Sequence, residues 1–246
     1  MSRTPETLRP YNDNEQKHLQ VEKMFDAIAP DYDFMNRLMS FRQDIRWRRV
    51  SLKRLTEFNP VTILDVATGT GDFAIDACNY LTPSEVVGID LSEEMMQVGR
   101  EKVKTLGLEN TIRFEQQDCL ALTFPDSTFD ALISAFGVRN FENILQGLKE
   151  MNRVLKPGGQ LLLLELSRPT WFPANLLFKV FTNWFMPLAG KLFTKDGKAY
   201  KYLPASIQLV PQGKTMLDLL NQAGFTDTRC TTFTFGACSL YTGTKR

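Results

Sequence analysis

Histidine and paired cysteines are the residues that this sequence most lacks. It contains one histidine, His18, and four cysteines that form no C-x-x-C pair, which are Cys78, Cys119, Cys230 and Cys238. A zinc centre built from these two residue types is therefore not expected, and no other metal site is indicated. Thiols without a disulfide pattern are typical of a reducing compartment, so we expect a cytoplasmic protein.

Long apolar runs and an excess of one charge are missing as well. No apolar stretch reaches the roughly 18 residues that a spanning helix needs, and residues 1–18 do not resemble a signal peptide. Lys and Arg number 29, against 28 Asp and Glu. This balance gives no indication of a nucleic-acid partner. The 246 residues suffice for one α/β domain with additions.

The first 58 residues predict a helical N-terminal extension or lid. Residues 1–18 are polar and are interpreted as a loosely docked tail, whereas residues 21–58 have a helical pattern that Pro60 closes. The remaining residues, 59–246, are expected to form one cofactor-binding domain.

Strands and helices alternate from residue 61 onwards. Predicted helices follow the first two strands, and two more cover residues 143–155 and 213–224. The predicted strands are 61–67, 86–90, 111–118, 129–136, 160–167, 225–235 and 237–245. This alternation predicts a doubly wound, Rossmann-like α/β fold with helices on both faces of the sheet. The last two strands add an antiparallel pair, which makes a seven-stranded mixed sheet.

A glycine-rich turn follows the first strand and runs from Asp65 to Gly71. Glycine lets the backbone approach a ligand closely, and the helix that follows offers free N–H groups. The pattern G-x-G-x-x-A suits any nucleoside cofactor, including a dinucleotide. Asp90, at the end of the second strand, is placed to accept hydrogen bonds from ribose hydroxyls.

Asp65 favours one cofactor over the other. A carboxylate directly before the turn would repel a pyrophosphate by an energy on the order of a few kcal/mol. S-adenosylmethionine (SAM) has no phosphate and carries two cationic groups. We therefore predict SAM, with a dinucleotide and an unliganded structural turn as the alternatives. Asp118 and Cys119 end the third strand and are expected to border the adenine, although Asp118 also suits a plain helix cap.

Four further motifs lie outside the glycine turn. They are YDFMNRLMSFRQDIRW (32–47), FGVRN (136–140), RVLKPGGQLLLLELS (153–167) and YKYLPASI (200–207). With them, the chain resembles the UbiE/COQ5 family of quinone C-methyltransferases over about residues 20–246. It departs from the family at Asp44, where many members have His, and at Ala135, where some members use Ser.

The resemblance implies a reaction and a set of cofactor contacts. SAM would methylate a ring carbon of a polyprenylated quinol precursor, either demethylmenaquinol, which the FRQDIRW stretch favours, or the equivalent ubiquinone intermediate. The family's SAM positions correspond to Thr70, Asp90, Asp118 and Cys119. With the glycine turn, the predicted cofactor site comprises Asp65, Thr68, Gly69, Thr70, Gly71, Asp90, Leu91, Asp118 and Cys119.

Methyl transfer to carbon requires near-attack geometry, exclusion of water and an electron-rich ring. Arg139 and Asn140 follow the fourth strand, at the edge that faces the cofactor site. We predict that Arg139 stabilises the quinolate and that Asn140 orients the hydroxyl or a water. An ion pair that ties loops together is the alternative role for Arg139. Tyr32 and Asp33 are expected to help close the site, with Asp33 as a candidate proton acceptor.

Residues 168–203 interrupt the alternation with an insertion rich in aromatic and basic residues. Its basic residues are Arg168, Lys179, Lys191, Lys195, Lys198 and Lys201, against the single acid Asp196; its aromatic residues are Trp171, Phe172, Phe178, Phe181, Trp184, Phe185, Phe193, Tyr200 and Tyr202. Such a composition suits peripheral contact with an anionic membrane. The alternatives are a helix packed on the domain and a homodimer interface.

Other functions remain open at this point. The chain could methylate another small acceptor, or bind SAM or NAD as a regulatory module. The charge balance disfavours RNA methylation, although residues 42–54 are basic.

Overall fold

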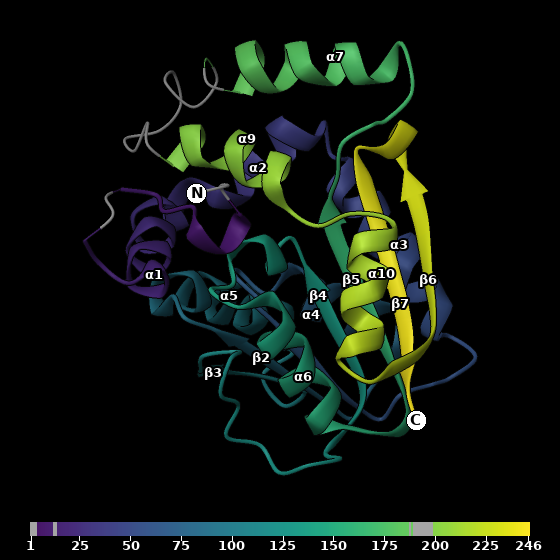
Figure 1. Cartoon of the computed structure of the whole chain (residues 1–246). Coiled ribbons are helices and arrows are strands. Elements are labelled where there is room, and N and C mark those ends of the chain that lie inside the picture. Colours follow the sequence, from purple (N-terminus) through teal and green to yellow (C-terminus); the bar gives the residue numbers. More distant parts are fainter. Residues whose placement is uncertain (1–3, 12–13, 187, 189–198) are drawn as a thin grey trace.

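A computed structural model describes residues 4–11, 14–186, 188 and 199–246 of the chain. Its centre is a seven-stranded sheet in the order β3-β2-β1-β4-β5-β7-β6 (Figure 1). The strands are β1 (Thr62–Val66), β2 (Glu85–Asp90), β3 (Ile112–Gln116), β4 (Phe129–Ala135), β5 (Leu155–Leu166), β6 (Phe225–Phe233) and β7 (Cys238–Lys245). Strands β1 to β5 pair in parallel, and β7 runs antiparallel between β5 and β6. The predicted seven-stranded mixed sheet is confirmed.

The start of β5 differs from the prediction. The predicted helix covered residues 143–155 and the predicted strand began at residue 160, but β5 already begins at Leu155 and includes the Pro-Gly-Gly sequence. Leu155 pairs with Phe129, and the register then shifts before Gln160 pairs with Ala131. The proline and glycines therefore lie in an irregularity within the strand, which is where a sheet tolerates such residues.

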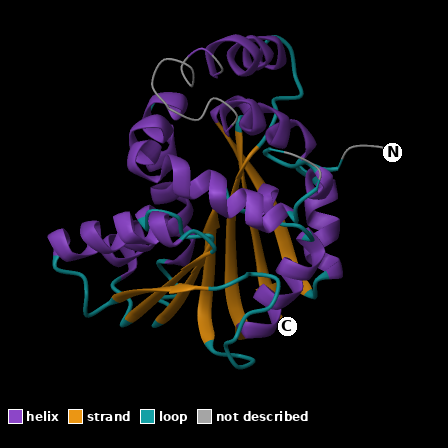
Figure 2. Ribbon diagram, turned by 90° about the vertical axis from the view of Figure 1, so that its left-hand side faces the viewer, coloured by secondary structure: helices purple, strands orange, loops and turns teal. Residues whose placement is uncertain are grey.

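Helices cover both faces of the sheet (Figure 2). Side chains alternate along a strand, so Leu64 and its neighbour Ile63 enter different cores. On the Leu64 face pack α6 (Ile144–Val154) and α10 (Lys214–Gln222). On the Ile63 face pack α3 (Gln43–Leu52), α4 (Asp72–Leu81) and α5 (Glu93–Leu106). This sandwich exposes the carboxyl ends of the parallel strands at one edge.

A third apolar cluster lies over that edge. It joins α1 (Lys17–Ile28), α2 (Tyr32–Ser40), the turn η5 (Phe181–Phe185) and α9 (Ala199–Leu209), with α7 (Ala174–Val180) outermost (Figure 1). The N-terminal region thus contributes α1 and α2 to this cap and α3 to the face of the sheet. Its action as a lid stays a prediction.

The start of the chain is attached more firmly than predicted. Residues 4–11 contain the short turn η1 (Pro5–Thr7), and the buried ammonium of Lys17 donates to the carbonyls of Pro5, at 2.8 Å, and Phe141, at 2.9 Å. Glu6 accepts from the backbone N–H of Ile144 at 3.0 Å. The description of residues 1–18 as a loosely docked tail was therefore wrong for the part that the structure describes.

Part of the aromatic and basic insertion is not covered. Lys191, Phe193, Lys195, Asp196 and Lys198 lie outside the described residues, and only the backbone of Tyr200 and Lys201 is described. In the segments that the structure describes, no helix is both long and apolar enough to cross a membrane.

Candidate functional site

The glycine turn is held by backbone contacts to the neighbouring strand. Gly69 and Gly71 have φ angles of +55° and +76°, which residues with a side chain rarely adopt. A Cβ on Gly71 would lie 2.7 Å from the ring of Phe114. The N–H of Gly69 donates to Asp90 Oδ2 at 2.8 Å, so the turn and the end of β2 form one unit.

Asp65 lies behind this turn rather than facing a ligand. It is fully buried and is absent from the lining of both cavities described below. Its Oδ2 accepts from Thr68 Oγ1 at 2.7 Å, while Oδ1 has no hydrogen-bond partner among the described residues. Burial raises the pKa of Asp65 to about 7. Asp65 therefore does not select the cofactor by direct contact; the side chains that line the cavity beside the turn would do so.

An acidic cavity opens beside the turn. Of the predicted cofactor residues, it is lined by Gly69, Asp90, Leu91, Asp118 and Cys119. Thr68, Thr70 and Gly71 are not in its lining and shape the turn instead. Four carboxylates border the cavity, from Glu22, Asp90, Asp118 and Glu142, and the described lining contains no Lys or Arg. A cationic ligand is favoured there, and a pyrophosphate is not.

Asp90 has the hydrogen-bonding capacity to hold hydroxyl groups. Its two oxygens each accept one backbone N–H, from Gly69 at 2.8 Å and from Ser92 at 3.0 Å. A carboxylate oxygen can accept more than one hydrogen bond, so both keep capacity for a ligand. Burial raises the pKa of Asp90. Asp118 lines the cavity and also accepts from the N–H of Leu120 at 2.9 Å. The described residues contain no helix between Asp118 and β4, so its alternative role as a helix cap was wrong.

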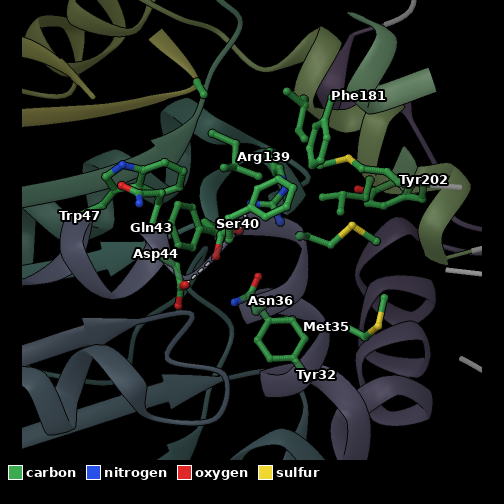
Figure 3. Close-up of a pocket in the computed structure, with 18 of the residues that line it drawn as sticks. Tyr32, Met35, Asn36, Ser40, Gln43, Asp44, Trp47, Arg139, Phe181 and Tyr202 are labelled. Carbon is green, nitrogen blue, oxygen red and sulfur yellow. Dashed lines mark hydrogen bonds between the residues drawn. The ribbon is translucent and has the colours of Figure 1, made fainter. Parts of the chain in front are cut away.

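A second, apolar cavity of about 250 Å³ lies beneath the cap (Figure 3). The only charged side chains in its described lining are Asp44 and Arg139. Phe25, Tyr32, Phe136 and Asn140 line both this cavity and the acidic one. The two cavities therefore adjoin at these four residues.

Arg139 and Asn140 lie in the turn η4 (Val138–Asn140), which follows β4. Arg139 is buried, with Nη1 2.9 Å from Glu165 Oε1 and also donating to the carbonyl of Phe136. Its Nε is buried without a hydrogen-bond partner among the described residues. Arg139 therefore forms the ion pair expected as its alternative role, and its Nε remains a donor without a partner among the described residues, beside the cavity. Asn140 Oδ1 accepts from the hydroxyl of Tyr202 at 3.2 Å, which fixes the orientation of its amide.

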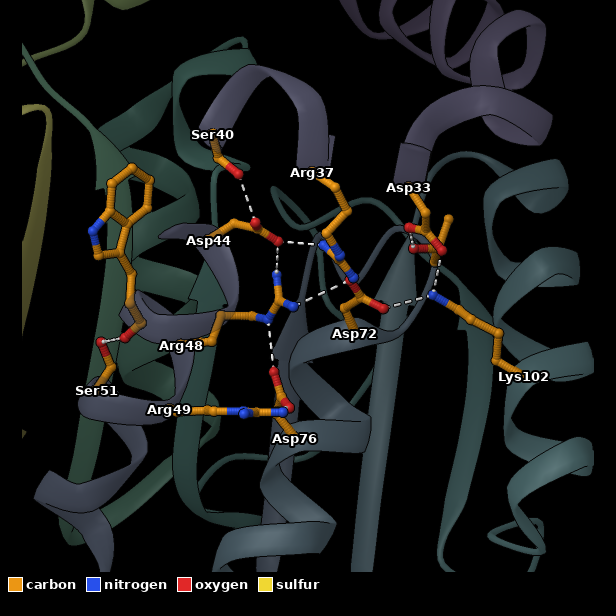
Figure 4. Close-up of polar contacts among 12 residues, drawn as sticks. Asp33, Arg37, Ser40, Asp44, Arg48, Arg49, Ser51, Asp72, Asp76 and Lys102 are labelled. Carbon is orange, nitrogen blue, oxygen red and sulfur yellow. Dashed lines mark hydrogen bonds and ion pairs between the residues drawn. The ribbon is translucent and has the colours of Figure 1, made fainter. Parts of the chain in front are cut away.

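The two remaining predicted catalytic residues are separated by the structure. Tyr32 lines both cavities, and burial raises its pKa to about 12, so it is a proton donor at neutral pH and not a base. Asp33 lines neither cavity. It accepts from Thr70 Oγ1 at 2.6 Å and pairs with Lys102 at 2.8 Å (Figure 4).

An ionic network under the glycine turn was not foreseen from the sequence. Arg37 pairs with Asp44 and Asp72, and the buried Arg48 pairs with Asp44 at 3.1 Å and Asp76 at 2.8 Å (Figure 4). The network ties α2 and α3 to α4. Arg48 lies in the basic stretch 42–54, and it serves an internal ion pair, not a nucleic-acid surface. Only the pair Asp44–Arg48 has a helical i,i+4 spacing. Asp72 and Asp76 lie 35 and 28 residues from Arg37 and Arg48, so the sequence gave no local signal for these contacts.

The fold defines a class of protein. The structure is similar to that of a SAM-dependent methyltransferase from Thermotoga maritima, with a TM-score of 0.63 and 16% identity, covering 92% of this chain and 99% of that chain. At that identity the likeness shows the fold alone, which is the Rossmann-like fold of a methyltransferase.

The sequence comparisons identify the family. Residues 12–245 match the model of the ubiE/COQ5 methyltransferase family. The chain is 48% identical to the demethylmenaquinone methyltransferase of Bacteroides fragilis, covering 100% of both chains. It is 43% identical to the ubiquinone/menaquinone biosynthesis C-methyltransferase UbiE of Geobacter sulfurreducens, covering 94% of this chain and 90% of that protein. The chain belongs to the ubiE/COQ5 methyltransferase family, and it is a methyltransferase.

Proposed function

We propose that the protein transfers the methyl group of SAM to a ring carbon of a polyprenylated quinol, in the first place demethylmenaquinol. The observation that carries this proposal is the junction of an acidic and an apolar cavity at Tyr32 and Asn140. The 48% identity to a demethylmenaquinone methyltransferase over the full length of both chains supports the menaquinone precursor. The name of the Geobacter relative keeps the ubiquinone precursor as the second candidate.

The acidic cavity suits SAM as its ligand. When bound, SAM supplies the methyl group from a cationic sulfonium. Asp90 would hold the ribose hydroxyls, and Asp118 and Cys119 would border the adenine, while Gly69 leaves room for close backbone contact. The described lining contains no Lys or Arg, so neither competes with the cationic groups of SAM for these carboxylates.

The residues at the junction orient the quinol and exclude water. Asn140, fixed by Tyr202, presents its amide N–H groups to a substrate oxygen. Arg139 adds its Nε donor and a positive charge that Glu165 partly neutralises. Hydrogen bonds that strengthen as the hydroxyl ionises would make the ring carbon more nucleophilic. Asp33 stabilises the glycine turn through Thr70 and does not reach either cavity.

The direct test is an acceptor assay. The protein is incubated with methyl-labelled SAM and with reduced demethylmenaquinone or the demethylated ubiquinone precursor, and the products are identified by mass. A label on the naphthoquinol ring supports the proposal. Turnover of only the benzoquinol selects the second candidate, and no label on either ring contradicts both.

The role of Arg139 needs a paired variant, because removing Arg139 alone leaves Glu165 as an unpaired buried charge. We expect Arg139→Met combined with Glu165→Gln to bind SAM like the wild type in calorimetry and to lose about 100-fold or more in kcat. Glu165→Gln alone is the matched control: it removes the counter-charge of Arg139, but its amide oxygen can still accept from the guanidinium, so most turnover should remain. If both proteins turn over equally well, Arg139 holds the fold and does not assist the reaction.

We also propose that the outer face of α7 and η5 contacts an anionic membrane. Phe178 and Phe181 face the apolar cavity, whereas Phe172, Leu176, Leu177, Val180 and Trp184 are exposed. Trp184 is 77% exposed. Arg168 and Lys179 accompany this face, and no acidic residue occurs from 168 to 188. Aromatic and cationic side chains together suit the headgroup region of an anionic bilayer.

Vesicle co-sedimentation tests this contact. Anionic vesicles should carry the wild-type protein down at low salt, and Lys179→Glu with Trp184→Ser should weaken binding at least fivefold. Leu106→Ser, which removes an exposed apolar residue on α5, is the control and should bind normally. If the wild type shows no salt-sensitive binding to the vesicles, the membrane proposal is contradicted. If it also forms a dimer in sedimentation velocity, and the double variant does not, the face contacts a second copy of the chain.

A further inference from the structure

A surface groove adjoins the apolar cavity at one end. It has a volume of about 620 Å³ and lies between α3 and the last part of β6 with the turn η6 (Thr234–Gly236). Its lining residues are Gln43, Arg46, Trp47, Val50, Thr232, Phe233, Thr234 and Phe235. Gln43, Trp47 and Thr234 line the apolar cavity as well, so the two spaces share a boundary.

This boundary is distinct from the junction with the cofactor. No residue is shared by the groove and the acidic cavity among the described lining residues. Figure 3 shows Trp47 and Gln43 at one end of the apolar cavity, with Tyr202 and Met35 toward the other. The side-chain hydrogen bond that crosses the boundary runs from Trp47 Nε1 to Thr234 Oγ1, at 2.9 Å. Displacement of these two side chains would join the two spaces.

The size of the apolar cavity leaves part of the proposed substrate outside it. Cavities that enclose drug-sized ligands measure about 300–1,000 Å³, and this one has about 250 Å³. A bicyclic quinol ring can fill such a space, but a chain of several isoprene units attached to it cannot be accommodated there as well. Because leaving the tail in water would be unfavourable, it needs an apolar path away from the ring.

We propose that the groove between α3 and the end of β6 holds the prenyl tail of the substrate, which leaves the apolar cavity past Trp47 and Thr234. The inference rests on the proposed quinol methylation and adds to it a tail subsite. Trp47, Val50, Phe233 and Phe235 supply the apolar contacts. A tail in this path places the ring between Trp47 and the junction with the cofactor.

The turn at the outer end of the groove holds an aromatic residue toward solvent. Thr234 and Phe235 both have positive φ, at +44° and +59°, and Phe235 is 74% exposed. Non-glycine residues rarely adopt this conformation, and when they do it often marks a functional site. The ring of Phe235 contacts Trp171 with centroids 5.9 Å apart, and Trp171 begins the segment proposed to contact the membrane. The groove therefore leads toward the surface from which a lipid-soluble substrate would arrive.

The other candidate exit, at the loop after α2, is closed by stacked rings. Phe41 lies 5.9 Å from Phe181 and 5.8 Å from Phe185, between ring centroids. A tail that used this exit would have to separate three rings. The path through the groove requires Trp47, which packs edge-on against Phe136, to move away from Thr234.

Blocking the groove with a large side chain tests the proposal. Val50→Trp and Thr232→Trp each fill the groove from one wall, and neither residue lines the apolar or the acidic cavity. Arg229→Trp, on the exposed part of β6 outside the groove, is the matched control. Each protein is assayed with demethylmenaquinols that carry one isoprene unit or several, dispersed in the same detergent.

We expect the wild type to have a lower KM for the longer tail. Both groove variants should raise the KM for the long-tailed quinol tenfold or more and leave the short-tailed quinol within twofold of the wild type, which also shows that they are folded. The control should change neither value. Unchanged values for both tails, or equal losses for both, would overturn the groove as the tail path. If the wild type methylates neither quinol, the proposed function itself fails, and the tail subsite fails with it.

Discussion

The buried carboxyl group of Asp65 predicts that the free energy of unfolding depends on pH. The carboxyl group is fully buried, one of its oxygens has no partner among the described residues, and burial raises its pKa from 3.8 to about 7. Between these two values the unfolded chain ionises Asp65 while the folded chain keeps it protonated. The folded state therefore binds more protons, and its stability falls as the pH rises through this window.

The magnitude follows from the size of the shift. Each pKa unit corresponds to about 1.36 kcal/mol, so a shift of roughly three units costs about 4 kcal/mol of unfolding free energy above pH 7. About 2–3 kcal/mol of this cost develops between pH 5 and pH 8. Asp65→Asn cannot ionise and keeps an oxygen that can accept from Thr68. The stability of this variant relative to the wild type should therefore rise by about 2–3 kcal/mol over that range.

Urea unfolding without SAM, followed by tryptophan fluorescence at several pH values, measures this difference. Asp130→Asn is the control with the opposite sign. Burial of Asp130 is outweighed by hydrogen bonds from Lys156 and Thr62, which lower its pKa. Its contribution is therefore present above the ordinary pKa and lost in acid, and it should stay constant between pH 5 and 8. A difference between Asp65→Asn and the wild type that does not change from pH 5 to pH 8 would refute the reasoning.

Four further substitutions test the packing, ion pairs and helix cap around the site, and one of them is a control. Gly88→Ala should lower the unfolding free energy by about 1–3 kcal/mol, since its Cβ would lie 2.7 Å from the Phe114 ring; an unchanged melting temperature would contradict this. Arg48→Met should cost about 3–5 kcal/mol because Asp76 loses its partner at 2.8 Å and the buried Asp44 keeps Arg37 as its only paired arginine. Arg100→Met, at an exposed pair, should cost less than about 1 kcal/mol in the same urea titration. Ser92→Ala removes the side-chain cap of α5 and should cost about 1 kcal/mol by thermal unfolding.

The parts of the fold that could be predicted are those with a local cause. Buried strands such as β1 are short apolar runs, and α5 begins after Ser92, whose hydroxyl accepts from the N–H of Met95. The mixed sheet followed because alternating strands and helices permit few topologies. The position of Asp90 at a strand end also followed, since parallel strands bring their carboxyl ends to one edge.

The parts that could not be predicted depend on residues far apart in the chain. Asp65 was predicted to contact the cofactor because the strand pattern places it next to the turn. The pattern does not show on which side of the turn its side chain lies. Asp33 was assigned to proton transfer, and its contacts with Thr70 and Lys102 exist only because α2 packs against α4 and α5. The buried ammonium of Lys17 likewise finds its carbonyl partners at Pro5 and Phe141 only after folding.

The sequence by itself determined the sheet, the glycine turn with its ribose-binding acid, and the resemblance to a quinone methyltransferase family. Each is written in a continuous segment, because backbone geometry and side-chain periodicity act over a few residues. Tertiary structure alone decided that an acidic and an apolar cavity meet at Tyr32 and Asn140, and that a groove continues from Trp47. A cavity is bounded by side chains from several elements, and only their packing fixes which of them face one another.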